Sequence, residues 1–200
     1  DRLRTGCKRA FMDNLTLRLS MGIERIAVLG AGQMGNGIAQ VAACAGYDVV
    51  MIDIKQDYLD KGLAAIENSL SRVVKKERMT QQEADDAISL ISISTEKIAA
   101  ADADLIVEAI PEIPELKFST FAELDSICKP ESILASNTSS ISINAIADAT
   151  NRPDRVIGMH FMNPVPVMKL VEIINGRETS SEVSESVIEA SERMGKVPLA

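Results

Sequence analysis

The one histidine of this 200-residue chain, His160, lies near the end of a mainly aliphatic run that is typical of a β-strand. Glu172 follows in a second aliphatic run, after a turn that contains two prolines. A carboxylate among valine and isoleucine side chains is costly unless it is paired. A histidine beside it would satisfy that carboxylate and act as a general base near neutral pH. The spacing therefore predicts a His160–Glu172 pair, against the alternative of a histidine that is only packed in the core.

A second group of residues has the GxGxxG pattern, in the segment Gly30-Ala31-Gly32-Gln33-Met34-Gly35. An expected strand at 25–29 precedes it, an expected helix at 33–46 opens from it, and a strand at 48–52 then ends at Asp53. In that context the three glycines permit a tight turn, close approach of a pyrophosphate and close packing of helix on strand. The helix N-terminus offers unpaired N–H groups to phosphates. The segment predicts a dinucleotide site.

Asp53 falls where the adenosine ribose of a dinucleotide would lie, and its carboxylate can accept both ribose hydroxyls. A 2′-phosphate would meet like charge there, and the next residues, 54–56, supply no arginine to receive it. NAD is therefore favoured over NADP. FAD stays open on the motif alone, because flavoproteins share it. The remaining alternative is a glycine-rich turn in a domain that binds no nucleotide.

The elements that must position these residues alternate along the chain. Further strands are expected at 91–94, 104–109, 132–136, 156–161 and 169–174, and helices at 56–79, from 80 onward, 114–128, 143–149 and 180–194. This order predicts an α/β fold, a doubly wound, mainly parallel Rossmann-type sheet with an inserted helical hairpin. Ligands bind at the carboxyl ends of such strands, which is where His160 is expected.

Composition excludes several classes of function. A net charge of −8 argues against a nucleic-acid partner, which needs a basic face. No apolar run is long enough to span a membrane. The chain has an odd number of cysteines, and no two of them have CxxC spacing: they are Cys7, Cys44 and Cys128. This favours reduced thiols and a cytoplasmic location. No metal site is expected.

The chain is expected to form one domain over 21–200. Residues 1–20 hold five Arg or Lys and are interpreted as an N-terminal extension, disordered or foreign to the natural start, with Met21 as the natural beginning. Their arginine-rich, acid-poor composition also resembles an organelle transit peptide, which is the alternative. Residues 195–200 are expected to enter another strand, as in a protein that continues beyond Ala200.

Two longer stretches, residues 135–140 (ASNTSS) and 158–172 (GMHFMNPVPVMKLVE), resemble signature segments of the 3-hydroxyacyl-CoA dehydrogenase family. The glycine loop and residues 107–112 (VEAIPE) are similar to two further markers of that family, and the likeness covers about 23–200. The resemblance implies NAD-dependent oxidation of (S)-3-hydroxyacyl-CoA to 3-oxoacyl-CoA, in fatty-acid β-oxidation or butanoyl metabolism.

The resemblance also implies roles for individual residues. His160 would take the proton of the 3-hydroxyl, Glu172 would orient His160, and Ser139 would hydrogen-bond the reacting oxygen. The positions implied to bind NAD are Gly30, Gly32, Gln33, Met34, Gly35, Asp53, Glu112, Lys117, Ser139 and Asn163. Ser69 and Lys76, on the long helix of the inserted hairpin, match positions that contact coenzyme A, although a lysine there also suits a solvated helix face.

In the family a helical C-terminal domain and a further catalytic asparagine follow the point where this sequence stops. The 200-residue chain by itself is therefore expected to bind NADH but to turn over substrate poorly, and its parent is expected to be a homodimer. Two alternatives stay open: a catalytically inactive relative, as lambda-crystallin is, and another β-hydroxy acid dehydrogenase, of which the 6-phosphogluconate type usually uses a lysine base. The preferred length of the substrate's acyl chain is also open, as is fusion of the protein to an enoyl-CoA hydratase module.

Overall fold

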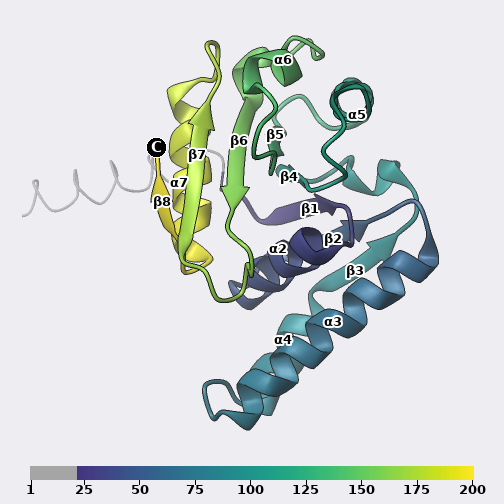
Figure 1. Ribbon diagram of the computed structural model, residues 1–200, viewed down its shortest axis with the longest axis vertical. Helices are drawn as coiled ribbons and strands as arrows, with labels where there is room; N and C mark the ends of the chain where they lie inside the picture. The colour runs from purple at the N-terminus through teal and green to yellow at the C-terminus, as the bar shows by residue number, and fades with distance from the viewer. Residues whose placement is uncertain (1–21) are drawn as a thin grey trace, which may run out of the picture.

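The computed structural model describes residues 22–200, so the expected N-terminal extension and Cys7 lie outside the described residues. Its sheet has the strand order β3-β2-β1-β4-β5-β6-β7-β8 (Figure 1). Strands β1 to β6 are parallel, β7 is antiparallel to β6, and β8 is parallel to β7. The strands are β1 (Arg25–Leu29), β2 (Asp48–Ile52), β3 (Ile91–Ser94), β4 (Leu105–Glu108), β5 (Ile133–Ser136), β6 (Val156–Phe161), β7 (Leu170–Asn175) and β8 (Val197–Leu199).

Helices cover both faces of the sheet, as the near-continuous aliphatic runs of buried parallel strands require. One apolar core lies between the sheet and α2, α3, α4 and α7, and the other lies between the sheet and α5, α6 and η1. The hairpin of α3 and α4 extends away from the sheet at the bottom of Figure 1. The helices are α2 (Gln33–Cys44), α3 (Gln56–Lys75), α4 (Gln81–Ser89), α5 (Pro114–Ile127), α6 (Ile143–Ala147) and α7 (Ser181–Arg193), with short 3₁₀ turns η1 (Lys97–Ala100) and η2 (Pro153–Arg155).

The expected doubly wound, mainly parallel sheet with an inserted helical hairpin is confirmed. Helix α4 begins at a capping box: the Thr80 side chain accepts a hydrogen bond from the Glu83 N–H, and the Glu83 carboxylate accepts one from the Thr80 N–H. None of the helices within residues 22–200 is both long and apolar enough to cross a membrane.

The long helix α3 ends at Lys75, four residues earlier than its sequence pattern predicts. Glu77 adopts a left-handed conformation with φ 55°, and its N–H donates to Val74 O at 2.9 Å. The Arg78 N–H then donates to Val73 O at 3.2 Å, which completes a Schellman motif. Lys76 therefore caps the helix rather than lying on it. The left-handed position that Glu77 takes after the cap is usually a glycine, so the end of the helix was not evident from the sequence.

The reversal at β7 follows from the length of the connection before it. Residues 162–169 join β6 to β7, and a parallel crossover needs about a dozen residues or more. The connection is therefore a hairpin, and its register places His160 directly opposite Glu172. The fold thus brings the two candidate catalytic residues together on neighbouring strands.

Candidate active site

The glycine turn is packed from two sides. Gly30 has φ +99°, and its N–H donates to Ile52 O at 2.7 Å. A Cβ on Gly30 would lie 2.6 Å from Ala109 O, at the end of the neighbouring strand β4. A Cβ on Gly35 would lie only 1.7 Å from Gly30 O. These two positions therefore need glycine for the turn itself and for the close approach of α2 to β1.

Gly32 is different, because no protein atom lies within 4 Å of the place a Cβ would take. It is the N-cap of α2, with φ −66°, a value that any residue can adopt. No side chain of the described residues caps this helix end, so no side chain takes up the N–H groups that a helix N-terminus leaves unpaired. The cradle that a Cβ on Gly32 would fill fits a pyrophosphate group, so these residues fit a dinucleotide cofactor.

Asp53 follows β2 and contacts the same turn. One carboxylate oxygen accepts the Ala31 N–H at 2.7 Å, and the other accepts the Ile54 N–H at 2.7 Å. Each oxygen retains a second lone pair for a further donor such as a ribose hydroxyl. Asp53 therefore also holds the glycine turn in place, which its sequence position did not reveal.

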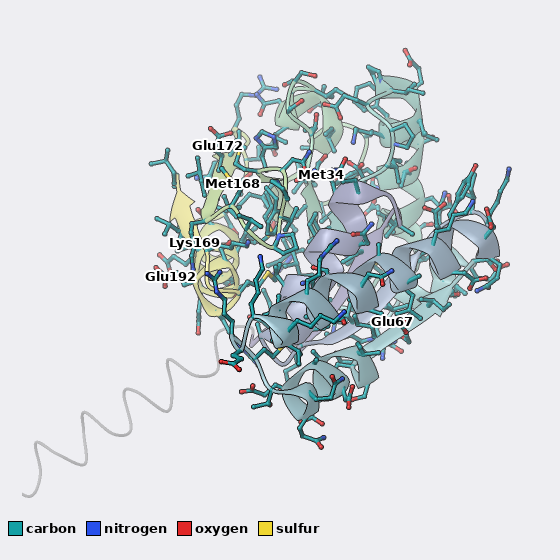
Figure 2. All side chains as sticks on the ribbon, turned by 60° about the horizontal axis from the view of Figure 1, so that its bottom comes forward. Met34, Glu67, Met168, Lys169, Glu172 and Glu192 are labelled. Atoms are coloured by element: carbon teal, nitrogen blue, oxygen red, sulfur yellow. The ribbon has the colours of Figure 1, made fainter. Side chains whose placement is uncertain are left out.

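The expected His160–Glu172 contact is present in the structure: Nδ1 of His160 lies 2.8 Å from Oε2 of Glu172. The His160 side chain is 22% exposed and that of Glu172 is 43% exposed. Glu172, labelled in Figure 2, is thus less buried than its neighbours Val171 and Ile173 suggest. The carboxylate keeps part of its hydration while it orients the imidazole.

A cleft of about 300 Å³ lies beside the carboxyl ends of β4, β5 and β6. It brings together predicted residues from several parts of the sequence, and Gln33 donates to Asn163 Oδ1 at 3.1 Å close by. The lining residues are Met34, Ala109, Ile110, Glu112, Lys117, Asn137, Ser139, His160, Phe161, Met162 and Asn163.

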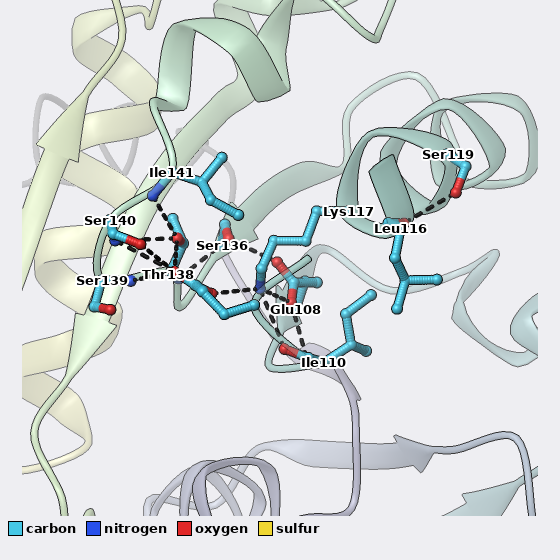
Figure 3. A network of polar contacts seen from close by, with 11 residues as sticks. Glu108, Ile110, Leu116, Lys117, Ser119, Ser136, Thr138, Ser139, Ser140 and Ile141 are labelled. Carbon is cyan, nitrogen blue, oxygen red and sulfur yellow. Dashed lines mark hydrogen bonds and ion pairs between the residues drawn. The ribbon is translucent and has the colours of Figure 1, made fainter. Parts of the chain in front are cut away.

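One wall of the cleft is a buried polar network around Lys117 (Figure 3). The Lys117 ammonium contacts Oε1 of Glu108 at 2.5 Å and Oε2 of Glu112 at 3.2 Å. Glu108 has no exposed surface, and it also accepts hydrogen bonds from Ser136 Oγ and the Ile110 N–H. A buried carboxylate needs such partners. The network joins the ends of β4 and β5 to α5.

Glu112 extends this network to the segment that follows β5. It accepts hydrogen bonds from the Thr138 hydroxyl and from the Ser139 N–H. Burial acts to raise the pKa of Glu112, but the Thr138 hydroxyl, the Lys117 ammonium and the Ser139 N–H together lower it to about 2. Glu112 is therefore ionised near neutral pH and fixes the backbone at Ser139.

Sequence reasoning did not assign roles to Glu108 and Asn137. Asn137 lines the cleft, and its Oδ1 accepts the Phe161 N–H at 2.8 Å, which ties β5 to the strand that carries His160. Glu108 lies in an aliphatic strand, so the argument that singled out Glu172 applied to it equally. Asn137 offered no such signal outside the family resemblance.

Ser69 and Lys76 do not line the cleft, and they lie on the inserted hairpin rather than at the strand ends and the glycine turn. Ser69 is half-buried on α3, and Lys76 is exposed at the cap of that helix. Their contact with coenzyme A stays a prediction. Within residues 22–200, no group of three or more His, Cys, Asp or Glu side chains is arranged to hold a metal ion.

Comparison with known proteins adds a family and several relatives. The family described as "3-hydroxyacyl-CoA dehydrogenase, NAD binding domain" matches residues 25–200. A probable 3-hydroxybutyryl-CoA dehydrogenase of Deinococcus radiodurans is 51% identical over 88% of this chain and 63% of its own length. The mitochondrial hydroxyacyl-coenzyme A dehydrogenase of Sus scrofa is 44% identical over 89% of this chain and 59% of its own length.

Solved structures show the same likeness. The (S)-3-hydroxybutyryl-CoA dehydrogenase of Ralstonia eutropha superposes with a TM-score of 0.87 at 44% identity, covering 89% of this chain and 63% of that one. The 3-hydroxybutyryl-CoA dehydrogenase of Escherichia coli gives 0.87 at 40% identity, covering 89% of this chain and 38% of that one. The chain spans about three fifths of the length of the probable 3-hydroxybutyryl-CoA dehydrogenases of Deinococcus radiodurans and Bacillus subtilis.

Two of the three glycines, Gly32 and Gly35, provide a matched pair of substitutions. Gly32→Ala is expected to change the free energy of unfolding by less than about 0.5 kcal/mol, because its Cβ meets no protein atom. It should nevertheless raise the Kd for NADH about tenfold or more, because the methyl group fills the cradle. Gly35→Ala should lower the free energy of unfolding by about 1–3 kcal/mol, because its Cβ overlaps Gly30 O. Urea denaturation and NADH fluorescence titration measure both effects. NADH affinity unchanged in Gly32→Ala would contradict this cofactor position.

A second prediction concerns acid stability. The pKa of Glu112 is about 2 in the folded chain, against an ordinary value of 4.5 for a solvated glutamate in the unfolded chain. Its ionised form therefore stabilises the fold above pH 4.5. That contribution is lost as pH falls from 4.5 toward 2. Glu112→Gln is therefore expected to show a shallower loss of stability across this window in urea denaturation. Glu67→Gln, a change on the exposed surface of α3 (Figure 2), should leave the slope as in the wild type. Equal slopes in all three proteins would refute the assignment.

Proposed function

This chain belongs to the 3-hydroxyacyl-CoA dehydrogenase family, as its NAD-binding domain, and we propose that the protein containing it oxidises (S)-3-hydroxyacyl-CoA to 3-oxoacyl-CoA. The observation that carries the proposal is the His160–Glu172 pair, with Nδ1 and Oε2 2.8 Å apart, at a cleft beside a dinucleotide turn. The cofactor assignment to NAD is confirmed by the family. When bound, NAD⁺ accepts the hydride that leaves carbon 3 of the substrate.

His160 is the proposed general base of this reaction. A hydrogen bond from Nδ1–H to Glu172 assigns the tautomer in which Nε2 carries the free lone pair. Nε2 takes the proton of the 3-hydroxyl as the hydride departs from the same carbon. The Glu172 carboxylate then stabilises the imidazolium, as a carboxylate does beside other catalytic histidines.

Ser139 is the proposed hydrogen-bond donor to the reacting oxygen. It lines the same cleft as His160, and its backbone N–H is held by Glu112 at 3.1 Å. A donor held in advance costs little reorganisation when negative charge develops on the substrate oxygen. Lys117 and Asn163 also line this cleft and are proposed to contact the cofactor there.

Three further features belong to the proposal. Ser69 and Lys76 are proposed to contact coenzyme A from the α3 side of the molecule. The parent protein is proposed to be a homodimer. The free thiols of Cys44 and Cys128 support a reducing, cytoplasmic location.

The function is tested by acetoacetyl-CoA reduction with NADH, in the 200-residue chain and in the complete product of its gene. In the complete product, His160→Gln is expected to lower kcat about 10²- to 10⁴-fold, because a general base acts mainly in the transition state. The Kd for NADH should stay within about twofold, which serves as the control for folding. Turnover near the wild-type rate would remove His160 as the base. Absence of turnover in the complete wild-type product would favour an inactive NAD-binding relative.

Asp53 provides a test of nucleotide choice. Asp53→Asn keeps an acceptor for the Ala31 N–H, gives up the one for the Ile54 N–H, and removes the charge that would face the ribose. NADH binding is expected to weaken by about 1.5–3 kcal/mol, the range for hydrogen bonds to charged groups. NADPH binding should weaken less, because the repulsion of its 2′-phosphate is also removed. Parallel fluorescence titrations with both nucleotides measure the difference, and equal affinity of the wild type for the two would contradict the assignment.

A further inference from the structure

Lys196 is a buried cation that the proposed reaction does not use. The residue is 8% exposed, and its ammonium donates hydrogen bonds to Val165 O and, at 2.9 Å, to Met168 O. Among residues 22–200 no carboxylate forms an ion pair with it. Burial, and then the nearby Lys169, lower the pKa of Lys196. A charge held this way is costly unless its hydrogen bonds are good ones.

The end of α7 places Lys196 at this position. Gly195 has φ +73°, and its N–H donates to Glu192 O at 2.9 Å. The Lys196 N–H donates to Ser191 O at 3.0 Å, which completes a Schellman motif. The Val197 N–H then donates to Lys169 O at 2.8 Å as β8 begins. The side chain of Lys196 therefore leaves a fixed backbone.

The two carbonyls that Lys196 holds belong to the connection between β6 and β7. Within this connection, the N–H groups of Val167 and Met168 both donate to Pro164 O. Val165 is buried against α2, since a Cβ on Gly37 would lie 2.8 Å from the Val165 Cβ. Figure 2 labels Met168 and Lys169 on the β7 side of the molecule.

The opposite end of the same connection forms part of the cofactor cleft. Met162 and Asn163 line the cleft, and Asn163 Oδ1 accepts a hydrogen bond from Gln33 in the first turn of α2. The connection also joins His160 to Glu172 along the chain. Its placement therefore affects both the cofactor contact and the catalytic pair.

We propose that Lys196 is a positioning residue for the cofactor cleft. From outside the cleft its ammonium fixes the 162–169 connection, and so holds Asn163 in place for NAD. This inference rests on the proposed function, because it places NAD beside Asn163. Lys196 itself does not contact the cleft. Its side chain ties the start of β8 to a cofactor-binding segment about thirty residues earlier in the chain.

If Lys196 acted through packing alone, its variants would rank differently in NADH affinity than if it acted through its hydrogen bonds. Lys196→Met preserves the aliphatic stem but leaves two buried carbonyls without their donor. Lys196→Arg restores a cation and its donors in a larger side chain. If packing alone mattered, Lys196→Met would keep NADH affinity nearer to wild type than Lys196→Arg. If positioning by hydrogen bonds matters, Lys196→Arg keeps the higher NADH affinity.

The test combines amide hydrogen exchange with NADH titration, on wild type and variants of the 200-residue chain. In Lys196→Met, the amides of Val167 and Met168 are expected to exchange at least about tenfold faster, while the amides of β1 and β4 keep wild-type rates. The Kd for NADH is expected to rise about tenfold, because part of the free energy of the lost charge-assisted hydrogen bonds appears as weaker cofactor binding. Lys196→Arg should stay within about threefold of wild type. The matched control is Lys169→Met, which removes an exposed ammonium that contacts Gly195 O at 3.3 Å, and it should stay near wild type.

Equal exchange at Val167 and Met168 in Lys196→Met and wild type would overturn the inference, as would better NADH binding by the methionine variant than by the arginine variant. Failure of the wild-type chain to bind NADH would overturn the proposed function, and with it the cofactor part of the inference. Should Lys196→Met not fold, Lys196→Gln replaces it. The shorter, uncharged amide should produce a smaller acceleration at the same two amides, and unchanged exchange there would again overturn the inference.

Discussion

The imidazole of His160 and the carboxylate of Glu172 meet because β7 returns antiparallel to β6 through a connection that is too short for a crossover. The register of that pairing places the two side chains opposite each other on one face. The connection, residues 162–169, must then cross the carboxyl edge of the sheet, and there it brings Asn163 to the cleft. One reversal of strand direction thus supplies a base, the group that orients it and part of the cofactor site.

Two buried lysines hold the walls of this site in different ways. Lys117 is neutralised by Glu108 and Glu112, and it joins α5 to the ends of β4 and β5. Lys196 has backbone carbonyls in place of carboxylates. Both cations therefore fix segments of main chain, although the chain as a whole carries a net charge of −8. An acidic protein can accommodate a phosphorylated cofactor in this way, because local N–H groups and paired ammoniums matter more than total charge.

The sequence alone predicted most of the fold and the centre of the site. The glycine pattern and the His160–Glu172 spacing had local signals, namely strand ends and a carboxylate in an aliphatic run. The same rule extended to Glu108, which went unassigned. The contacts of Lys196 could not have been predicted, because its partners are backbone carbonyls that leave no trace in the residue types. The early end of α3 was missed for a similar reason: Glu77 adopts a conformation that normally marks a glycine.

The separation of paired residues along the chain has a consequence for the order of folding. The β6–β7 hairpin closes a loop of 12 residues between His160 and Glu172, whereas contact of β1 with the start of β4 spans 79 residues. The difference in loop-closure entropy is about 1.7 kcal/mol in favour of the hairpin. Local pairings form sooner than distant ones at comparable stability. The His160–Glu172 pair therefore forms from nearby chain, as do the contacts of the glycine turn with Ile52 and Asp53. The packing of Gly30 against Ala109 depends on the more distant pairing of β1 with β4.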